Sequence, residues 1–235
     1  MLGKKKVATV VAEFLGTGIL TLLVLSVQRS TIGVPFFVAL IAGLVFIIMI
    51  FTFADLSGAY LNPAIVVGLW TARKVSTLRG ILLIAVELLG AWTAYYVYTY
   101  FVNTSLTNIG GHFTGRTLAA EAVATGILAL VWGAAVFGKW SNNLKAPAVG
   151  VAVMVAMIVA STAGIGLANP ALSLGVRAWV WGTYVAGPVI GAVVGVNLYG
   201  LLFADGNALK LSLNSKAISK TTAKAKSKTK AKAKK

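Results

Sequence analysis

The residues best placed for chemistry in this sequence are two copies of the triplet Asn-Pro-Ala. The copies are Asn62-Pro63-Ala64 and Asn169-Pro170-Ala171. Asparagine is a favoured helix N-cap and proline a favoured first helical residue, so each triplet predicts the start of a helix. If the side-chain carbonyl of each asparagine caps its helix, its NH2 group can bind an acceptor such as a passing hydroxyl. The positive helix ends at the same place would form a barrier to cations.

Six apolar segments must position these triplets, and each is long enough to cross a bilayer, which takes about 20 helical residues. The sequence is 58% hydrophobic and only 11% charged, whereas soluble domains carry about 25% charged residues. Lipid offers the backbone no hydrogen-bond partners, so we expect all six segments to be helices. They cover residues 7–27, 34–54, 81–102, 118–137, 146–167 and 178–203.

The helix that follows each triplet is predicted to be much shorter than a span. Residues 63–70 would extend about 12 Å, which is under half of the apolar thickness of a bilayer. Two such half-helices that enter from opposite faces would meet at mid-depth and complete one further crossing. Irregular polar backbone at that depth is tolerated only around a cavity that contains water.

The two halves of the chain repeat each other. Residues 12–20 match residues 120–128 at six of nine positions, and Glu13 and Glu121 precede their triplets at nearly equal distances. Each half holds three spans, an odd number, so the second copy must be inverted in the membrane. We therefore predict an all-α membrane domain at residues 1–208, with repeats at about 7–102 and 118–203. Residues 209–235 are predicted to be a disordered lysine-rich tail.

The distribution of charge indicates orientation rather than nucleic-acid binding. The net charge is +16, but ten of the 21 basic residues follow Leu209, and no aromatic residues alternate with them. We expect the tail to lie near anionic lipid head groups and expect no nucleic-acid partner. The remaining basic residues favour a topology with both termini in the cytoplasm, by eight to three. Lys4–Lys6, Arg73, Lys74, Arg79, Lys139 and Lys145 would then face inward, and Arg29, Arg116 and Arg177 outward.

Little in the sequence could support catalysis. The chain has no cysteine, one histidine and five acidic residues. We find no nucleophile–base pair and no cluster of metal ligands, and we predict neither a catalytic residue, a metal site nor a cofactor. We also expect no pair of acids near either half-helix, where a coupling ion could bind. The chain is therefore not expected to be an enzyme.

The chain resembles the aquaporin, or major intrinsic protein, family over about residues 7–204. The two triplets, residues 57–64 (SGAYLNPA), residues 12–17 (AEFLGT) and residues 187–192 (GPVIGA) carry the resemblance. It implies a homotetramer with one pore per subunit, and passive flow of water, glycerol or other small neutral solutes. It also implies that Glu13 and Glu121 brace the two re-entrant loops. Glu87 stands where the family pattern usually has glutamine.

The chain departs from that family at the selectivity filter, where an arginine normally follows the second triplet. Here Leu172 takes that place. Counting from the triplets puts the other filter positions at Ala42, at Met157 (or Ala156, if a residue is inserted near Gly164) and at Gly166. All are apolar or small, which predicts a wider and more hydrophobic constriction than that of a strict water channel. Loss of the arginine removes hydrogen-bond donors and a fixed positive charge.

The residues that distinguish water channels from glycerol channels in this family give a mixed indication. Ser173 and Tyr184 resemble the water type, whereas Arg177 and Val185 resemble the glycerol type. We expect permeability to water and small uncharged solutes, in an integral protein of the plasma membrane. Two alternatives stay open: a secondary transporter, because inverted repeats with broken helices also build transporters, or a non-conducting structural or lipid-binding protein whose pore Met157 and Leu172 occlude.

Overall fold

A computed structural model describes residues 4–204 of the chain. Of these, residues 4–201 belong to one compact unit. The predicted tail at 209–235 lies outside the described residues. The elements are α1 (Lys4–Gln28), α2 (Pro35–Phe53), α3 (Pro63–Thr71), α4 (Thr77–Val102), α5 (Gly115–Phe137), α6 (Asn142–Ala160), α7 (Pro170–Gly175), the π-helical turn η1 (Gly182–Ala186) and α8 (Gly187–Leu202).

Six of these helices are long and apolar enough to cross a membrane, as the sequence predicts, with η1 and α8 together making the sixth. The third and fifth spans begin four residues before their predicted starts, at Thr77 and Asn142, and two further boundaries are wrong. The fifth span ends at Ala160 rather than at residue 167, because residues 161–169 form the loop that leads into α7. The sixth begins at Gly182 rather than at residue 178. Its first turn is π-helical because Pro188 has no N–H for the helical ladder and its ring clashes with the carbonyl four residues earlier.

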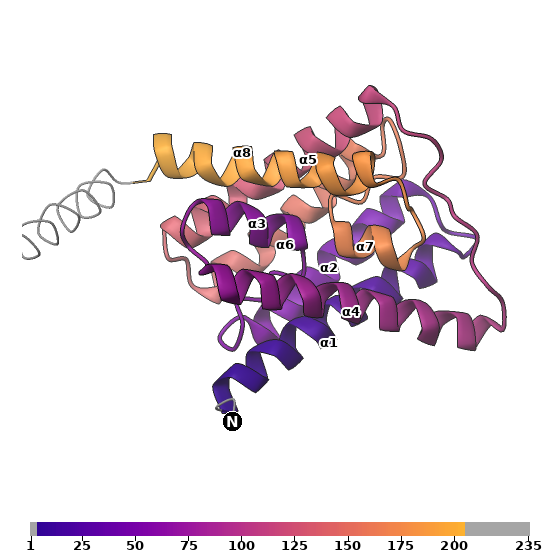
Figure 1. The fold of residues 1–235 in the computed structure, drawn as a ribbon, viewed down its shortest axis with the longest axis horizontal. Helices are drawn as coiled ribbons and strands as arrows, with labels where there is room; N and C mark the ends of the chain where they lie inside the picture. The colour runs from indigo at the N-terminus through magenta and orange to yellow at the C-terminus, as the bar shows by residue number, and fades with distance from the viewer. Residues whose placement is uncertain (1–3, 205–235) are drawn as a thin grey trace, which may run out of the picture. The chain divides into compact units, whose positions relative to one another are not determined.

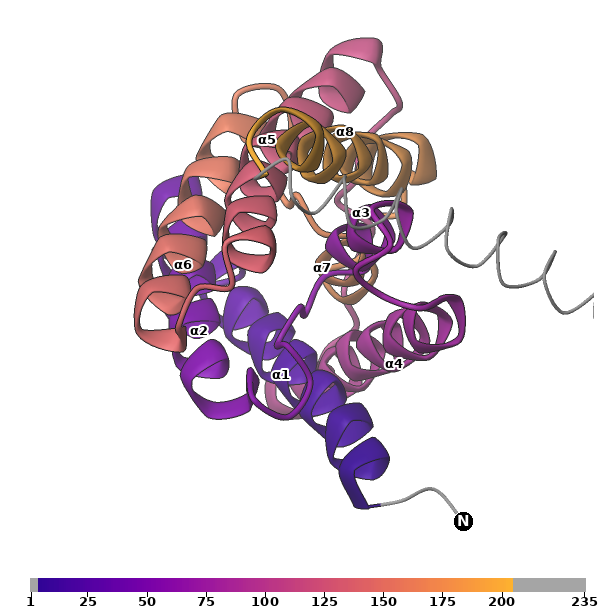
Figure 2. The ribbon, with the colours of Figure 1, turned by 90° about the vertical axis from the view of Figure 1, so that its left-hand side faces the viewer.

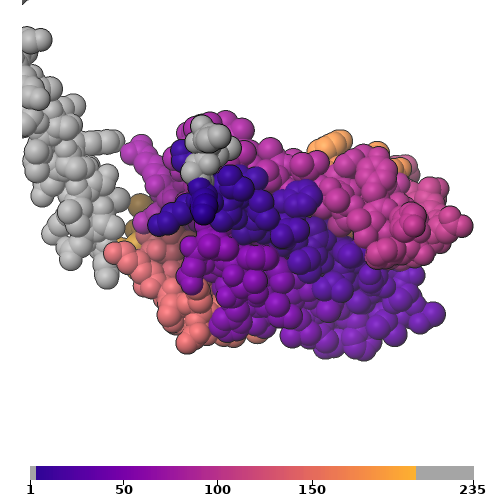
Figure 3. Space-filling view, turned by 90° about the horizontal axis from the view of Figure 1, so that it is seen from below, coloured from indigo at the N-terminus to yellow at the C-terminus, as the bar shows by residue number. Residues whose placement is uncertain are grey.

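The two half-helices α3 and α7 lie end to end between α8 and α4, as Figure 1 shows. In the view along the long helices, α1, α2, α5 and α6 complete the ring (Figure 2). Figure 3 shows one outer face of the bundle. On this face α1 (indigo) packs beside α2 (purple) and the C-terminal part of α4 (magenta). This arrangement places the beginnings of both half-helices inside the bundle.

Close helix contacts follow the internal repeat. A Cβ added at Gly90 in α4 would overlap with the Phe14 carbonyl oxygen of α1, and one added at Gly191 in α8 would overlap with the Ala122 carbonyl oxygen of α5. Phe14 and Ala122 occupy equivalent positions of the two repeats. At the junction of the repeats, Gly43 of α2 packs against Gly150 of α6. A Cβ added to either glycine would lie 2.6 Å from the carbonyl oxygen of the other. Small residues let the backbones approach this closely.

The half-helices pack on the long helices by the same symmetry. Gly68 in α3 faces the carbonyl oxygen of Ala192 in α8, 2.6 Å from where a Cβ would stand. Gly175, at the equivalent place in α7, faces the carbonyl oxygen of Ala91 in α4 at 3.0 Å. The predicted inverted repeat is therefore confirmed, and it fixes where the two half-helices meet.

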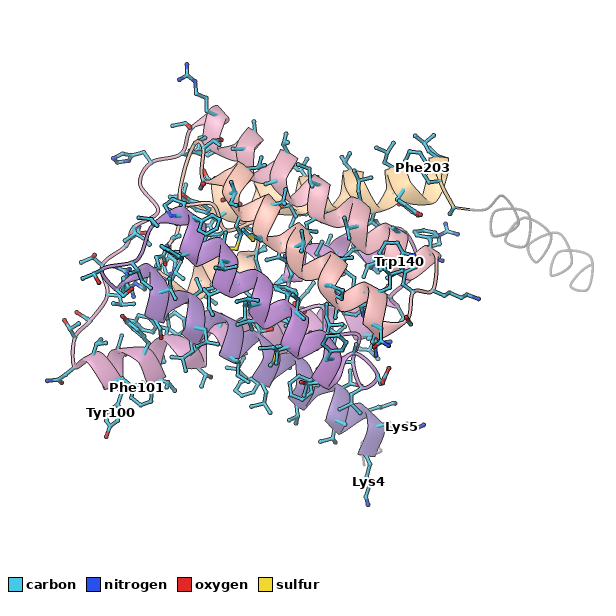
Figure 4. The ribbon with its side chains drawn as sticks, turned by 180° about the vertical axis from the view of Figure 1, so that it is seen from behind. Lys4, Lys5, Tyr100, Phe101, Trp140 and Phe203 are labelled. Carbon is cyan, nitrogen blue, oxygen red and sulfur yellow. The ribbon has the colours of Figure 1, made fainter. Side chains whose placement is uncertain are left out.

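The ends of the bundle carry polar and aromatic side chains, and its outer faces are apolar. Figure 4 shows Lys4 and Lys5 at one end, and Tyr100 and Phe101 pointing outward at the other. Tyr100 is 83% exposed and Phe101 69%. Aromatic side chains at such positions are typical of the membrane–water interface.

Candidate functional site

The two half-helices begin in the same way. The Asn62 side-chain oxygen accepts a hydrogen bond from the backbone N–H of Ala64 at 3.0 Å, and that of Asn169 accepts one from Ala171 at 2.9 Å. Pro63 and Pro170 are the first helical residues. The N-caps predicted from the triplets are thus present. α7 is shorter than expected, because it ends at Gly175 after six residues.

The two caps also hold each other's loop. The amide nitrogen of Asn62 donates to the carbonyl oxygen of Ala168 at 2.9 Å, and that of Asn169 donates to the carbonyl oxygen of Leu61 at 2.8 Å. Each acceptor is the residue just before the other asparagine. An amide nitrogen carries two N–H groups, so this crossed pair of bonds uses one and leaves the second for another acceptor.

The residue before each asparagine has a left-handed backbone, with φ of 51° at Leu61 and 49° at Ala168. This conformation costs a residue with a side chain about 1–2 kcal/mol, so neighbouring groups must hold it. Glu13 does so at the first loop, since its two carboxyl oxygens accept the N–H groups of Tyr60 and Leu61 at 3.0 and 2.9 Å.

Glu121 makes the equivalent contacts at the second loop. Its two oxygens accept the N–H groups of Leu167 and Ala168 at 2.9 and 2.7 Å. Both glutamates are almost fully buried. Each therefore contributes two hydrogen bonds to a loop that would otherwise have unpaired backbone donors.

Our expectation that no two acids gather near a half-helix is wrong. The carboxyl group of Glu87 in α4 lies against that of Glu13 and near the backbone N–H of Asn62. Neither of its oxygens has a hydrogen bond of good geometry. Both carboxyl oxygens of Glu13 accept hydrogen bonds from the loop. Glu87 is therefore the acid of this pair whose oxygens make no such bond.

Two cations and a tyrosine complete the first loop. Arg79 donates to the carbonyl oxygen of Ser57 at 2.6 Å, and Lys145 donates to that of Gly58 at 2.7 Å. Burial raises the pKa of the Tyr60 hydroxyl above its ordinary value, and the nearby Arg79 guanidinium partly opposes this. Tyr60 is therefore neutral at physiological pH. In the second loop, the Tyr184 hydroxyl accepts a hydrogen bond from the Ile165 N–H at 3.4 Å.

The predicted filter residues lie on four different segments, and all are sheltered. Ala42 of α2 is fully buried, Met157 of α6 is 2% exposed and Leu172 of α7 is 1% exposed. Gly166 has φ of +77°, and a Cβ there would overlap with the Met157 carbonyl oxygen. The structure thus brings Gly166 against Met157, while Ala156, the alternative position, is also fully buried. A water-sized sphere scarcely reaches any of these side chains.

Sequence reasoning missed the backbone groups of this site. The carbonyl groups of Leu61 and Ala168 belong to apolar residues, whose side chains give no sign of the contacts that their backbones make. Arg79 and Lys145 were assigned only to topology, although both donate to the first loop. Their closeness to the ends of spans was the one available signal, and it does not distinguish a loop brace from an interfacial anchor.

We expect Asn62→Ala and Asn169→Ala to destabilise the protein by similar amounts, because their contacts are equivalent. Each change removes an N-cap, which costs about 1 kcal/mol, and leaves a carbonyl unpaired, which costs about 1–3 kcal/mol. Unfolding in sodium dodecyl sulfate, followed by helical circular dichroism, measures the loss. Asn143→Ala, on an exposed residue at the start of α6, is the control and should change little. An unchanged midpoint for either triplet variant would contradict the crossed bonds.

Comparisons with known proteins agree with this geometry. The sequence profile described as Major intrinsic protein matches residues 3–199. A probable TIP-type aquaporin of Medicago truncatula is 33% identical over 163 residues, which are 65% of each chain. Aquaporin PIP2-4 of rice is 35% identical over 176 residues, covering 65% of this chain and 60% of its own. The match thus spans slightly less than two thirds of these relatives.

The fold has a solved counterpart as well. The aquaglyceroporin of Plasmodium falciparum aligns with a TM-score of 0.69 at 23% identity, over 83% of this chain and 96% of that one. This likeness concerns the fold alone. Since the family profile covers nearly the whole described unit, the chain is an integral membrane protein that belongs to the major intrinsic protein family.

Proposed function

We propose that this chain is a passive channel for water and small uncharged solutes such as glycerol. The observation that carries the proposal is the crossed pair of asparagine bonds, which fixes two amide nitrogens at the junction of the half-helices. Each nitrogen has a second N–H for the oxygen of a passing molecule. The two helix ends beside them present positive dipole ends, which disfavour cations at the same point.

The predicted constriction favours uncharged solutes over strict water selection. Leu172, Ala42, Met157 and Gly166 offer no charged side chain, so no fixed guanidinium competes for space or binds water there. An apolar wall tolerates the carbon groups of a solute such as glycerol. This supports glycerol as a solute beside water, with proton exclusion resting on Asn62 and Asn169.

The channel is best placed as a homotetramer in the plasma membrane, with both termini in the cytoplasm. The basic residues favour that orientation, and the outer faces of the helices are apolar, as lipid or a neighbouring subunit requires. The lysine-rich tail at 209–235 would then face the anionic lipid of the cytoplasmic leaflet. Tagging each terminus and testing protease access in sealed vesicles distinguishes the two orientations.

Flux into proteoliposomes tests the proposal. Stopped-flow light scattering should show water permeability well above that of empty vesicles, and glycerol uptake that is linear in concentration. Because Glu87 lies beside Glu13, the assay should be repeated with imposed Na⁺ and H⁺ gradients. Saturable uptake that follows either gradient would favour a secondary transporter instead.

A second candidate function rests on the burial of Met157 and Leu172, each no more than 2% exposed. If these side chains stay in place, they close the path, and the protein is a non-conducting membrane component. Water permeability no higher than that of empty vesicles would favour this function.

We expect Met157→Ala to raise both water and glycerol permeability, because it removes a long side chain from the predicted constriction. Glycerol, the larger solute, should gain more, by roughly threefold or above against a smaller gain for water. The same stopped-flow assay measures both. Met154→Ala, one turn earlier on α6 and partly buried, is the matched control. Equal permeability of Met157→Ala and the unchanged protein would remove Met157 from the constriction and leave Ala156 as the alternative.

A further inference from the structure

An apolar groove lies on the outside of the bundle, behind the two half-helices. Residues of α4 and α8 line it together with residues of both half-helices, and its volume is about 210 Å³. Its walls are almost wholly aliphatic and aromatic. They include Val67, Leu88, Leu174, Trp179, Val185 and Val189.

The groove extends from mid-depth to one end of the bundle. Pro63 and Pro170, the first residues of α3 and α7, line its inner part, and Trp179 and Trp181 line its outer part. Trp181 is 67% exposed, as tryptophan is at the level of lipid head groups. The distance from the centre of a bilayer to that level is about 15 Å, half of the apolar thickness. The groove therefore runs from the junction of the half-helices toward the level of the lipid head groups.

A cation stands at the outer part of this groove. The guanidinium carbon of Arg177 lies 4.1 Å from the ring centroid of Trp179 and 5.5 Å from that of Tyr95. Its buried Nε has no hydrogen-bond partner. No acidic residue occurs between Glu121 and Asp205, or in α4 after Glu87. Arg29, which donates to the Val176 carbonyl oxygen at 3.2 Å, adds a second positive charge nearby.

We propose that the groove binds one acyl chain of an anionic phospholipid, whose phosphate is held by Arg177. The apolar walls suit the chain, and the Arg177 guanidinium, whose Nε has no hydrogen-bond partner, suits the phosphate, to which arginine can donate two parallel hydrogen bonds. The course of the groove, from the two prolines to the two tryptophans, fits a lipid that enters from the end of the bundle where α1 finishes. A bound chain would pack against the backs of both half-helices and stabilise their junction. The proposal requires the membrane orientation of the bundle and no particular permeating solute.

The test compares phosphatidylglycerol with phosphatidylcholine of the same acyl chains, added to the purified full chain in detergent. Phosphatidylglycerol should raise the thermal midpoint more than phosphatidylcholine, and native mass spectrometry should show it retained. Arg177→Gln should weaken the apparent affinity for phosphatidylglycerol about tenfold, because charge-assisted bonds to the phosphate are lost. Leu88→Trp, which fills the groove, should remove the effect of both lipids on the midpoint.

Matched variants separate the groove from the general surface. Arg116→Gln removes an exposed arginine at the same end of the bundle, and Leu89→Trp enlarges a residue on α4 that is 55% exposed and outside the groove. Both should respond to phosphatidylglycerol as the unchanged protein does. Helical circular dichroism and water flux first establish that each variant is folded. An Arg177→Gln or Leu88→Trp protein with an unaltered response, or equal responses to the two lipids in the unchanged protein, would overturn the proposal.

Discussion

Replacing Glu121 with alanine should destabilise the protein more than the loss of either asparagine cap. The carboxylate accepts the buried N–H groups of Leu167 and Ala168 at 2.9 and 2.7 Å. A buried N–H left without its acceptor costs about 1–3 kcal/mol, so with two such groups the variant should lose roughly 2–6 kcal/mol. Ala168 would also keep its left-handed backbone without the bond that holds it. We expect water permeability to fall to the level of empty vesicles.

Two further variants, Glu121→Gln and Glu87→Gln, are compared with Glu121→Ala. Glu121→Gln keeps one acceptor oxygen but places an NH2 group against a backbone N–H, so its loss should be intermediate. Glu87→Gln should be tolerated, since neither carboxyl oxygen of Glu87 has a hydrogen-bond partner, and glutamine keeps the volume of the buried side chain. Unfolding midpoints and stopped-flow permeability measure all three variants. A Glu121→Ala protein as stable and as permeable as the Glu87→Gln control would show that the second loop holds its shape without the carboxylate.

Much of this fold follows from local features of the sequence. Apolar runs predict the six spans, and an asparagine followed by proline predicts both half-helices with their caps. The matched pair Glu13 and Glu121 pointed to the inverted repeat, whose contacts Gly90 and Gly191 now show. These signals work because each depends on neighbouring residues or on a repeated pattern.

The parts that sequence did not predict depend on contacts between distant segments. Leu61 and Ala168 adopt left-handed backbones although neither is glycine, and only the folded loops reveal that the buried glutamates hold them there. The fifth span is predicted to reach residue 167 because residues 161–167 carry no charge and are mostly small or apolar. Such a segment fits a helix end and a re-entrant loop equally well until Gly166 meets the end of α6. The closeness of Glu87 to Glu13 likewise requires α1 and α4 to be packed together.

Replacing Leu172 with arginine should reduce glycerol permeability more than water permeability. Leu172 directly follows the second triplet and is 1% exposed among the other predicted filter residues. A guanidinium there occupies more space, adds hydrogen-bond donors for water and introduces a fixed positive charge. We expect glycerol flux to fall roughly tenfold and water flux less than threefold. Proton flux, followed with a dye enclosed in the vesicles, should fall as well.

The control for this change is Leu172→Met, which keeps an apolar side chain of similar volume and should leave the ratio of the two fluxes nearly unchanged. The ratio matters more than either flux, because poor insertion of a variant lowers both in proportion. If arginine at position 172 reduced water and glycerol equally, Leu172 would lie outside the constriction. Selection would then depend on the asparagine junction and Met157. If the flux ratio instead changes in favour of water while the midpoint of unfolding is preserved, Leu172 lies at the narrowest part of the path. The absence of an arginine at that position would then explain why solutes larger than water can enter.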